Sequence, residues 1–287
     1  MTWKLTTVTH LYYSPCGHTK RITINLAQQL VKGLELTLKE IDFTLPAARV
    51  QNYSFARNEL LVIGFPTYAG KLPNKILPDI KARLKGNDTP VIPLVTFGNR
   101  NFDNSLAELC AVMEEAGFKP IAAAAMVSEH VFSEKLASGR PSQLDLEELA
   151  DFGHKVLTLI KRGSSEQALE IITDDNPDHL LVPGEAKAPY YQPCGIDDKP
   201  VNFLKAKPKT HSDLCTHCGI CAQVCPMGSI DPTDTNSVPG ICIKCQACVK
   251  HCPTGAEYFD DEAFLSHVRM LEENFVEPKN NSFYFLN

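Results

Sequence analysis

Apolar residues in the first half of the chain follow patterns that predict strands alternating with helices. Between the apolar runs, residues recur with helical spacing, as in the series Ile22, Leu26, Leu30 and Leu34. Strands joined by crossover helices imply an open parallel sheet. The expected fold class is therefore α/β, with a doubly wound, five-stranded parallel sheet. Its expected strands are Leu5–Tyr13, Leu36–Phe43, Leu60–Phe65, Val91–Phe97 and Ile121–Val127.

The character of the chain changes after Gly163. Six prolines lie between Pro177 and Pro208, a density that blocks both helices and central strands. Near the end of the chain, Phe264, Val268, Leu271 and Phe275 share one helical face, which predicts a helix that docks on a core. We therefore predict four parts: a domain at 1–162, an extended linker at 163–207, a small α+β domain at 208–260, and a helix with a tail at 261–287.

Charge and composition narrow the class of protein. Residues 1–162 carry 19 Lys and Arg against 16 Asp and Glu, whereas residues 163–287 carry 9 against 18. Neither part has the strong basic patch of a nucleic-acid-binding protein, and no apolar run approaches the ~18 residues of a membrane span. The first residues also lack the features of a secretory signal, so we expect a cytoplasmic protein. Its oligomeric state stays open.

Eight of the eleven cysteines fall in two runs with the same C-x2-C-x2-C-x3-C-P spacing. The runs are Cys215, Cys218, Cys221 and Cys225, and Cys242, Cys245, Cys248 and Cys252. Three cysteines this close can hold three corners of an iron–sulfur cubane, and soft thiolates suit such clusters. Structural zinc is the alternative, but zinc ribbons need neither a third cysteine at this spacing nor a Cys-Pro pair. The pattern therefore favours two 4Fe-4S clusters.

Residues 208–258 resemble the bacterial-type two-cluster ferredoxins. In that family the fourth cysteine of each run ligates the cluster of the other run. The resemblance thus implies one cluster on Cys215, Cys218, Cys221 and Cys252. It implies a second cluster on Cys242, Cys245, Cys248 and Cys225.

A candidate anion site follows the first expected strand, in the run Ser14-Pro15-Cys16-Gly17-His18-Thr19. Hydroxyls and backbone N–H groups at a helix N-terminus attract phosphate, and Gly17 allows close approach of the backbone. The loop resembles the S-x-T-G-x-T loop with which flavodoxins hold the phosphate of FMN. It departs from that pattern at Cys16 and His18, although Ser14, Thr19 and the backbone donors remain.

Two more loops, Gly64–Gly70 and Thr96–Asp103, follow later strands, at the edge where ligands bind in doubly wound sheets. In flavodoxins the corresponding loops flank the flavin ring, which makes Tyr68 and Phe102 candidates for stacking and Ala69 or Gly70 a candidate carbonyl partner of flavin N5–H. The alternatives are another phosphate compound, or no ligand. The predicted FMN-binding residues are Ser14, Pro15, Cys16, Gly17, His18, Thr19, Pro66, Thr67, Tyr68, Ala69, Gly70, Thr96, Phe97, Gly98, Asn99, Asn101, Phe102 and Asp103.

The whole chain resembles the flavodoxin–ferredoxin fusion proteins of anaerobes. That resemblance implies electron transfer with redox partner proteins, in which FMN couples two-electron carriers to one-electron clusters. No acid–base residue set stands out, so no catalytic residue is predicted. A reductase of a small acceptor at the flavin face and a redox sensor are the alternatives; an open pocket lined by Tyr68, Phe102 and His130 would favour the reductase. The opposite net charges predict that the cluster domain docks on the loop side of the first domain.

Overall fold

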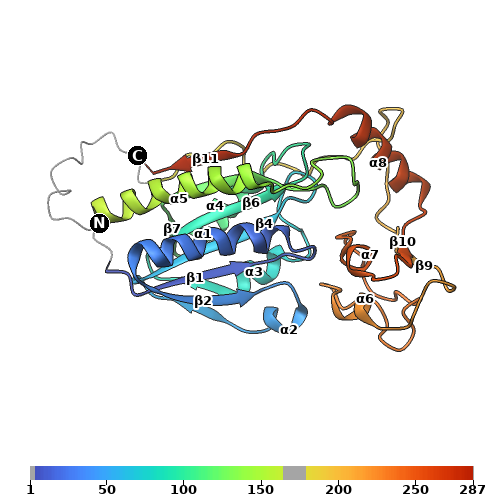
Figure 1. Ribbon diagram of the computed structural model, residues 1–287, viewed down its shortest axis with the longest axis horizontal. Coiled ribbons are helices and arrows are strands. Elements are labelled where there is room, and N and C mark those ends of the chain that lie inside the picture. Colours follow the sequence, from blue (N-terminus) through green and yellow to red (C-terminus); the bar gives the residue numbers. More distant parts are fainter. Residues whose placement is uncertain (1–3, 164–178, 287) are drawn as a thin grey trace.

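The computed structural model describes residues 4–163 and 179–286, and a parallel sheet forms the centre of its larger domain (Figure 1). Five parallel strands run in the order β2-β1-β4-β6-β8. This is the flavodoxin-like doubly wound order, so the predicted fold class is confirmed. The strands are β1 (Thr7–Tyr12), β2 (Thr37–Asp42), β4 (Glu59–Pro66), β6 (Thr89–Phe97) and β8 (Ala122–Val127).

Helices cover both faces of this sheet and create two apolar cores. On one face lie α1 (His18–Leu34) and α5 (Gln143–Gly163), which bury residues such as Leu26 and Phe152. On the other lie α3 (Leu77–Arg83) and α4 (Ser105–Glu115). Because both faces are covered, β6 is buried along its whole length.

Two further strands extend the sheet beyond the five expected ones. β7 (Phe118–Pro120) pairs with β6, and β11 (Ser282–Phe285) pairs antiparallel with β8. The expectation of a plain C-terminal tail is therefore corrected. β11 was missed because it is short and its partner strand is distant in sequence. The phenyl rings of Phe283 and Phe285 lie 5.1 and 5.2 Å from the ring of Phe152 on α5.

The remaining elements are short, apart from one helix. α2 (Pro46–Arg49) follows β2, and β3 (Tyr53–Phe55) pairs with β5 (Leu84–Gly86). The cluster domain, here called the cluster module (residues 208–260), contains β9 (Lys209–Thr210), α6 (Ile220–Gln223), α7 (Ala247–His251) and β10 (Glu257–Tyr258). The expected C-terminal helix is α8 (Glu262–Asn274), whose first turn is capped by the side chain of Asp261.

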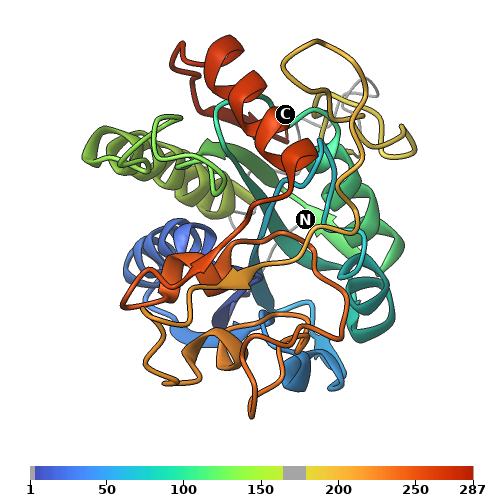
Figure 2. The same ribbon diagram turned by 90° about the vertical axis from the view of Figure 1, so that its right-hand side faces the viewer.

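The cluster module and α8 lie over the end of the sheet from which the phosphate-loop candidate emerges (Figures 1 and 2). Of the predicted linker, residues 164–178 lie outside the described residues. The part from residue 179 onward is extended: it runs from Glu114 at the end of α4 to Asn104 at its start, and then follows the same end of the sheet as the cluster module. No helix in the described ranges is long and apolar enough to cross a membrane.

Candidate functional site

Side-chain hydrogen bonds fix the conformation of the loop between β1 and α1. Gly17 has a φ of 87°, a left-handed conformation that favours glycine, and starts α1. The Ser14 hydroxyl accepts a hydrogen bond from the Lys20 amide at 3.0 Å, and the Thr19 hydroxyl bonds that of Thr96 at 2.8 Å. Within the described residues, the backbone N–H groups of Cys16, His18 and Thr19 have no hydrogen-bond partner. These amides are free to hold an anion.

A cavity of about 810 Å³ begins at this loop and crosses the carboxyl ends of the strands to the cluster module. Its volume lies within the ~300–1,000 Å³ of small-molecule and cofactor sites. The structure thus brings most of the predicted FMN-binding residues together around one space. Those on its wall are Ser14, Pro15, Cys16, His18, Thr19, Pro66, Thr67, Tyr68, Ala69, Gly70, Thr96, Phe97, Gly98 and Asn101.

The side chains of Asn99, Phe102 and Asp103 do not line the cavity, and neither does Gly17. The Asn99 amide donates to the carbonyls of Phe275 and Glu277, so it fastens the segment after α8. The Phe102 ring packs on Phe97 at 5.4 Å, against the core. Phe102 is therefore not placed to stack on a flavin, whereas Tyr68 is on the wall.

Asp103 supports the loop that contains Gly70. Its carboxylate pairs with Arg100, and a Cβ on Gly70 would lie 2.3 Å from Asp103 Oδ2. The Gly70 carbonyl accepts from the Asn104 amide at 2.9 Å, and the Ala69 carbonyl accepts from the Tyr191 amide at 2.8 Å. Each carbonyl keeps a second lone pair, so the expected contact with flavin N5–H stays a prediction.

The linker forms a wall of the cavity that sequence reasoning missed. Buried Lys71 donates to the carbonyls of Ala186 and Ala188 at 2.6 and 2.9 Å, while it pairs with Glu108 at 2.9 Å. These bonds hold the linker so that Tyr190 and Tyr191 reach the cavity. The pair of tyrosines in a proline-rich segment was the available signal, because exposed linkers seldom need adjacent aromatic rings.

Arg100, His130 and His267 form a polar end of the same cavity. The Arg100 guanidinium lies 4.0 Å from the Tyr191 ring centre, and the Nδ1 of His267 lies 2.8 Å from the Cys194 carbonyl. Burial, together with the nearby His267 and Arg100, lowers the pKa of His130 to about 4. His130 is therefore neutral at pH 7, and its Nδ1 accepts from the Phe132 amide at 3.2 Å.

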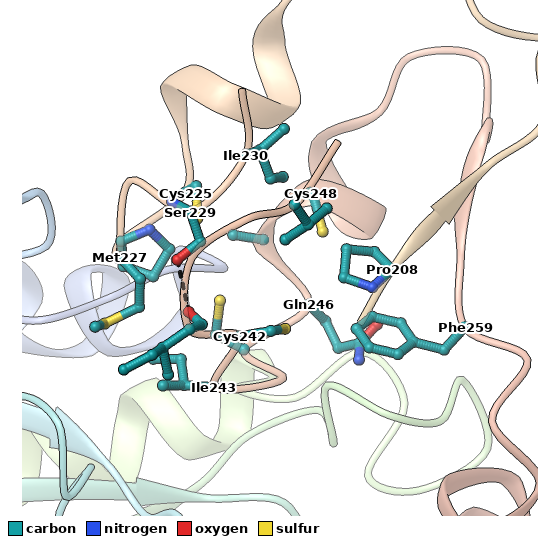
Figure 3. Close-up of a pocket in the computed structure, with 15 residues that line it drawn as sticks. Pro208, Cys225, Met227, Ser229, Ile230, Cys242, Ile243, Gln246, Cys248 and Phe259 are labelled. Carbon is teal, nitrogen blue, oxygen red and sulfur yellow. Dashed lines mark hydrogen bonds between the residues drawn. The ribbon is translucent and has the colours of Figure 1, made fainter. Parts of the chain in front are cut away.

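Four cysteines of the cluster module line a second cavity, shown in Figure 3. They are Cys225, Cys242, Cys245 and Cys248, so Cys225 lies with the three cysteines of the other run. In the described part of the chain, no three His, Cys, Asp or Glu side chains converge as ligands of a single metal ion would. Thiols arranged around a shared space fit the donor set of a cluster.

The two runs repeat the same local contacts. Cys225 Sγ accepts from the Ser229 amide at 3.3 Å, and Cys252 Sγ accepts from the Ala256 amide at 3.2 Å. Such N–H···S bonds stabilise thiolates and tune bound clusters. Burial raises the pKa of Cys245 well above its usual value and that of Cys221 to about 11. These thiols therefore lose their protons when a metal centre binds.

Three contacts fix the cluster module to the first domain. The Cys16 thiol donates to the Cys245 carbonyl at 3.1 Å, and Lys250 pairs with Glu129 at 3.1 Å. Buried Arg49 of α2 donates to the Pro226 carbonyl in the turn after Cys225. The cluster module therefore docks on the loop side of the sheet, as the opposite charges predict, and Cys242 and Cys245 line both cavities.

Comparison with known families identifies the class of the C-terminal part. Residues 208–231 and residues 239–255 each match a family model described as a 4Fe-4S binding domain. The chain therefore carries 4Fe-4S clusters, and the zinc alternative is set aside. It joins a flavodoxin-like fold to a ferredoxin-type iron–sulfur module and is an electron-transfer protein in this general sense.

Solved structures similar to the chain align over its first half. A flavodoxin from Streptococcus pneumoniae TIGR4 is 16% identical, with a TM-score of 0.39, over 53% of this chain and 99% of that one. A flavodoxin from an archaeon is 15% identical, with a TM-score of 0.36, over 54% and 99%. A short-chain flavodoxin associated with a bacterial microcompartment is 14% identical, with a TM-score of 0.39, over 56% and 100%. No curated protein matches the sequence.

Proposed function

We propose that this protein binds FMN in the large cavity and transfers electrons between FMN and the two clusters. One observation carries the proposal: the same cavity is bounded by the phosphate loop on one side and by the cluster-ligand segment Cys242–Cys245 on the other. FMN exchanges one or two electrons, whereas a 4Fe-4S cluster normally exchanges one. The chain would then couple two-electron carriers to one-electron carriers.

The residues around the cavity suit FMN. The unpaired amides of Cys16, His18 and Thr19 would hold the phosphate, with the Ser14 hydroxyl as a further donor. Tyr68, Phe97 and the linker tyrosines supply aromatic walls for a planar ring. Residues of the linker, of α8 and of the cluster module line the other sides of this space.

Cofactor analysis tests the first half of the proposal. Acid should release FMN, and not FAD, from protein purified without air. The double variant Ser14→Ala with Thr19→Ala should bind FMN more weakly, measured as the loss of quenching of flavin fluorescence. An unchanged FMN affinity would remove this loop from the site.

Flash photoreduction of the flavin tests the second half. Because the cluster module is fixed to the phosphate loop, cluster reduction should follow at a rate that does not depend on protein concentration. A rate proportional to concentration would mean that electrons pass between molecules, and intramolecular transfer would be rejected.

We further propose that redox partner proteins meet the clusters rather than the flavin, in the cytoplasm. Most residues of the flavin loops are buried or half-buried, whereas Cys218 and most of its loop are exposed. The cluster built on Cys215, Cys218 and Cys221 would be the outer cluster. The cluster built on Cys242, Cys245 and Cys248 would be the inner cluster, next to the flavin.

Reduction of a small acceptor at the flavin is the second candidate function. The polar end of the cavity, with Arg100, His130 and His267, favours it, since a covered flavin remains open to small molecules. Both histidine pKa values are lowered by burial, so neutral rings are available to donate or accept hydrogen bonds. A screen of small electron acceptors, with His267→Phe as the variant, tests this function. An acceptor whose reduction needs His267 would support it, and equal rates in the variant would argue against it.

A further inference from the structure

Gln246 carries a buried polar group that no protein atom satisfies. Its side chain is 5% exposed, and its Nε2 atom has no hydrogen-bond partner among the described residues. A buried amide without a partner costs free energy, so its persistence calls for an explanation.

The position of Gln246 supplies that explanation. The residue lines the cavity of the inner cluster together with Cys225, Cys242 and Cys245, and Figure 3 shows its side chain at the margin of this space, next to Phe259. An amide NH₂ is a hydrogen-bond donor, and the acceptors that a cluster would bring into this cavity are sulfides and thiolates.

We propose that the Gln246 side chain donates a hydrogen bond to a sulfur atom of the inner cluster and raises its reduction potential. Reduction adds one electron to the cluster and increases the negative charge on its sulfur atoms. A donor that points at sulfur therefore stabilises the reduced form more than the oxidised form. This inference rests on the cysteine ligands and does not require the flavin.

The first cysteine run has no side-chain donor at the matching position. The two cysteine runs are offset by 27 residues, so the equivalent of Gln246 is Gly219, directly after Cys218. The backbones match, because Gln246 has a φ of 63° and Gly219 a φ of 73°. The only difference at this position is the side chain. The inner cluster should therefore have the higher reduction potential and be the first of the two clusters to be reduced.

Left-handed backbone at Gln246 strengthens the case for a role of the side chain. A glycine would adopt this conformation without strain, as Gly219 does. A glutamine at this position adopts a strained backbone conformation and also leaves its side-chain amide without a partner in the protein. A bond to the cluster offsets both costs.

Exchange of the two residues tests the proposal with each site as the control of the other. Gln246→Gly removes the donor and relaxes the backbone, so the variant should fold. Gly219→Gln adds a donor where a Cβ meets nothing nearer than the Gln223 amide at 3.9 Å. Both proteins should keep about eight irons and eight sulfides per chain, as two 4Fe-4S clusters require.

Potentiometric titration followed by electron paramagnetic resonance gives the readout. Gln246→Gly should lower the potential of one cluster signal, Gly219→Gln should raise that of the other, and the double exchange should reverse their difference. Gln246→Asn, which keeps a shorter donor, should fall between wild type and glycine. An unchanged or raised potential in Gln246→Gly, or equal shifts of both signals, would overturn the proposal. Because no step uses FMN, failure of FMN binding would leave this result interpretable.

Discussion

Individual cysteines of the cluster module occupy unequal environments. Cys245 and Cys248 are less than a tenth exposed, whereas Cys218 is exposed. Cys225 shares the inner cavity, although its run contains the three thiols assigned to the outer cluster. The turn that follows it is tied to Arg49 of the first domain. The geometry thus links one cluster ligand directly to the larger domain.

Replacement of Cys225 by serine should damage the inner cluster and spare the outer one. Serine replaces the soft thiolate of Cys225, so the cavity keeps only the three thiolates of Cys242, Cys245 and Cys248. About four irons per chain should remain, with one of the two cluster signals lost. Cys252→Ser is the matched control and should remove the other signal. If Cys225→Ser instead removes the signal of the cluster built on Cys215, Cys218 and Cys221, the crosswise ligand assignment is wrong.

Burial of His130 predicts a loss of stability in mild acid. The unfolded chain protonates this histidine below its usual pKa of 6.5, while the folded protein does so only below about 4. The unfolded state therefore binds more protons between these values, so stability is full above pH 6.5 and falls as the pH drops toward 4. For this residue alone the loss is about 3 kcal/mol at ~1.4 kcal/mol per pKa unit.

His130→Asn isolates that contribution, because asparagine can still accept from the Phe132 amide. Urea unfolding at several pH values should show a flatter decline between pH 6.5 and 4 than in wild type. His179→Asn, at a side chain that is 75% exposed, is the control and should leave the decline intact. Parallel declines in wild type and His130→Asn would show that this histidine is not responsible.

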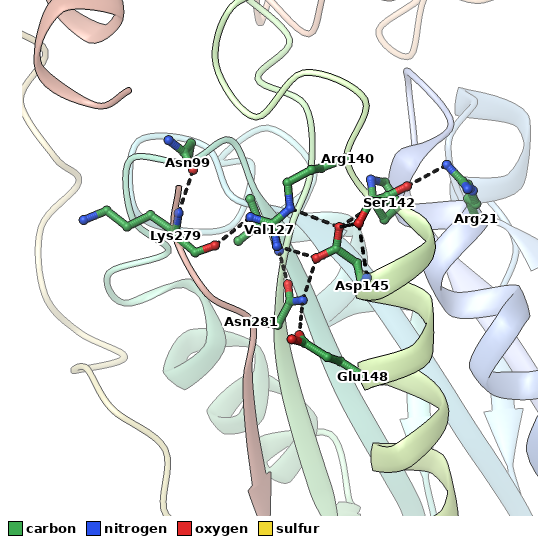
Figure 4. Close-up of polar contacts among 10 residues, drawn as sticks. Arg21, Asn99, Val127, Arg140, Ser142, Asp145, Glu148, Lys279 and Asn281 are labelled. Carbon is green, nitrogen blue, oxygen red and sulfur yellow. Dashed lines mark hydrogen bonds and ion pairs between the residues drawn. The ribbon is translucent and has the colours of Figure 1, made fainter. Parts of the chain in front are cut away.

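At the scale of elements, the C-terminal segment ties the two domains together. α8 packs on the cluster module through Phe264, whose ring lies 5.1 Å from that of Phe259. The chain then passes Asn99 and enters β11 at the edge of the larger sheet. Before β11, Asn281 accepts from the Val127 amide at 2.8 Å and donates to Asp145 and Glu148 (Figure 4). Although burial opposes it, hydrogen bonds from Arg140, Ser142 and Asn281 hold the pKa of Asp145 well below its usual value.

Asn281→Ala should therefore loosen this segment. It leaves the Val127 amide without its acceptor and removes a donor from the Asp145 carboxylate. We expect a loss of about 1–3 kcal/mol in the free energy of unfolding, measured with urea. Asn87→Ala, at an exposed asparagine, should cost little. A cost no larger than that of the control would mean that this network does not hold β11.

The sequence predicted elements wherever their pattern was long and local. The apolar runs predicted the strands of the parallel sheet, and the spacing of Ile22, Leu26 and Leu30 predicted α1. The spacing of the cysteines predicted the 4Fe-4S clusters. β11 was not predictable, because four residues give little periodicity and the pairing partner is remote. The packing of Phe102 on Phe97 was not predictable for a different reason: an aromatic residue after a strand can face either the ligand or the core, and spacing does not distinguish the two.

On the scale of the whole molecule, charge distinguishes the two ends of the proposed electron path. Asp213, Asp231 and Asp234 lie in the two loops beside the cysteines Cys215 and Cys218; Asp213 and Asp234 are exposed and Asp231 is half-buried, and within the described residues none of the three forms an ion pair. Lys209 and Lys250 of the cluster module are paired with Asp260 and Glu129. A cluster with four thiolates adds further negative charge. The outer face should therefore attract carriers with a positive surface.

Electron transfer to cytochrome c, a basic one-electron carrier, should slow as salt is added, because screening shortens the reach of these charges to about 10 Å at 0.1 M ionic strength. Asp213→Lys should lower the second-order rate at low salt, measured by stopped-flow absorbance. Asp151→Lys on α5 carries the same charge change away from the cluster module and should have little effect. Equal slowing in both variants would point to net charge alone, and not to the outer face.

The placement of β11 has a consequence for how the protein is made. The partner strand β8 leaves the ribosome early, whereas β11 emerges only after the entire cluster module. Until then β8 is an unpaired edge, which is open to association with other chains. The larger domain can thus complete its sheet only after the cysteine runs have been synthesised. A chain that stops before β11 would keep this edge of the sheet exposed, where chaperones and quality-control proteases can recognise it.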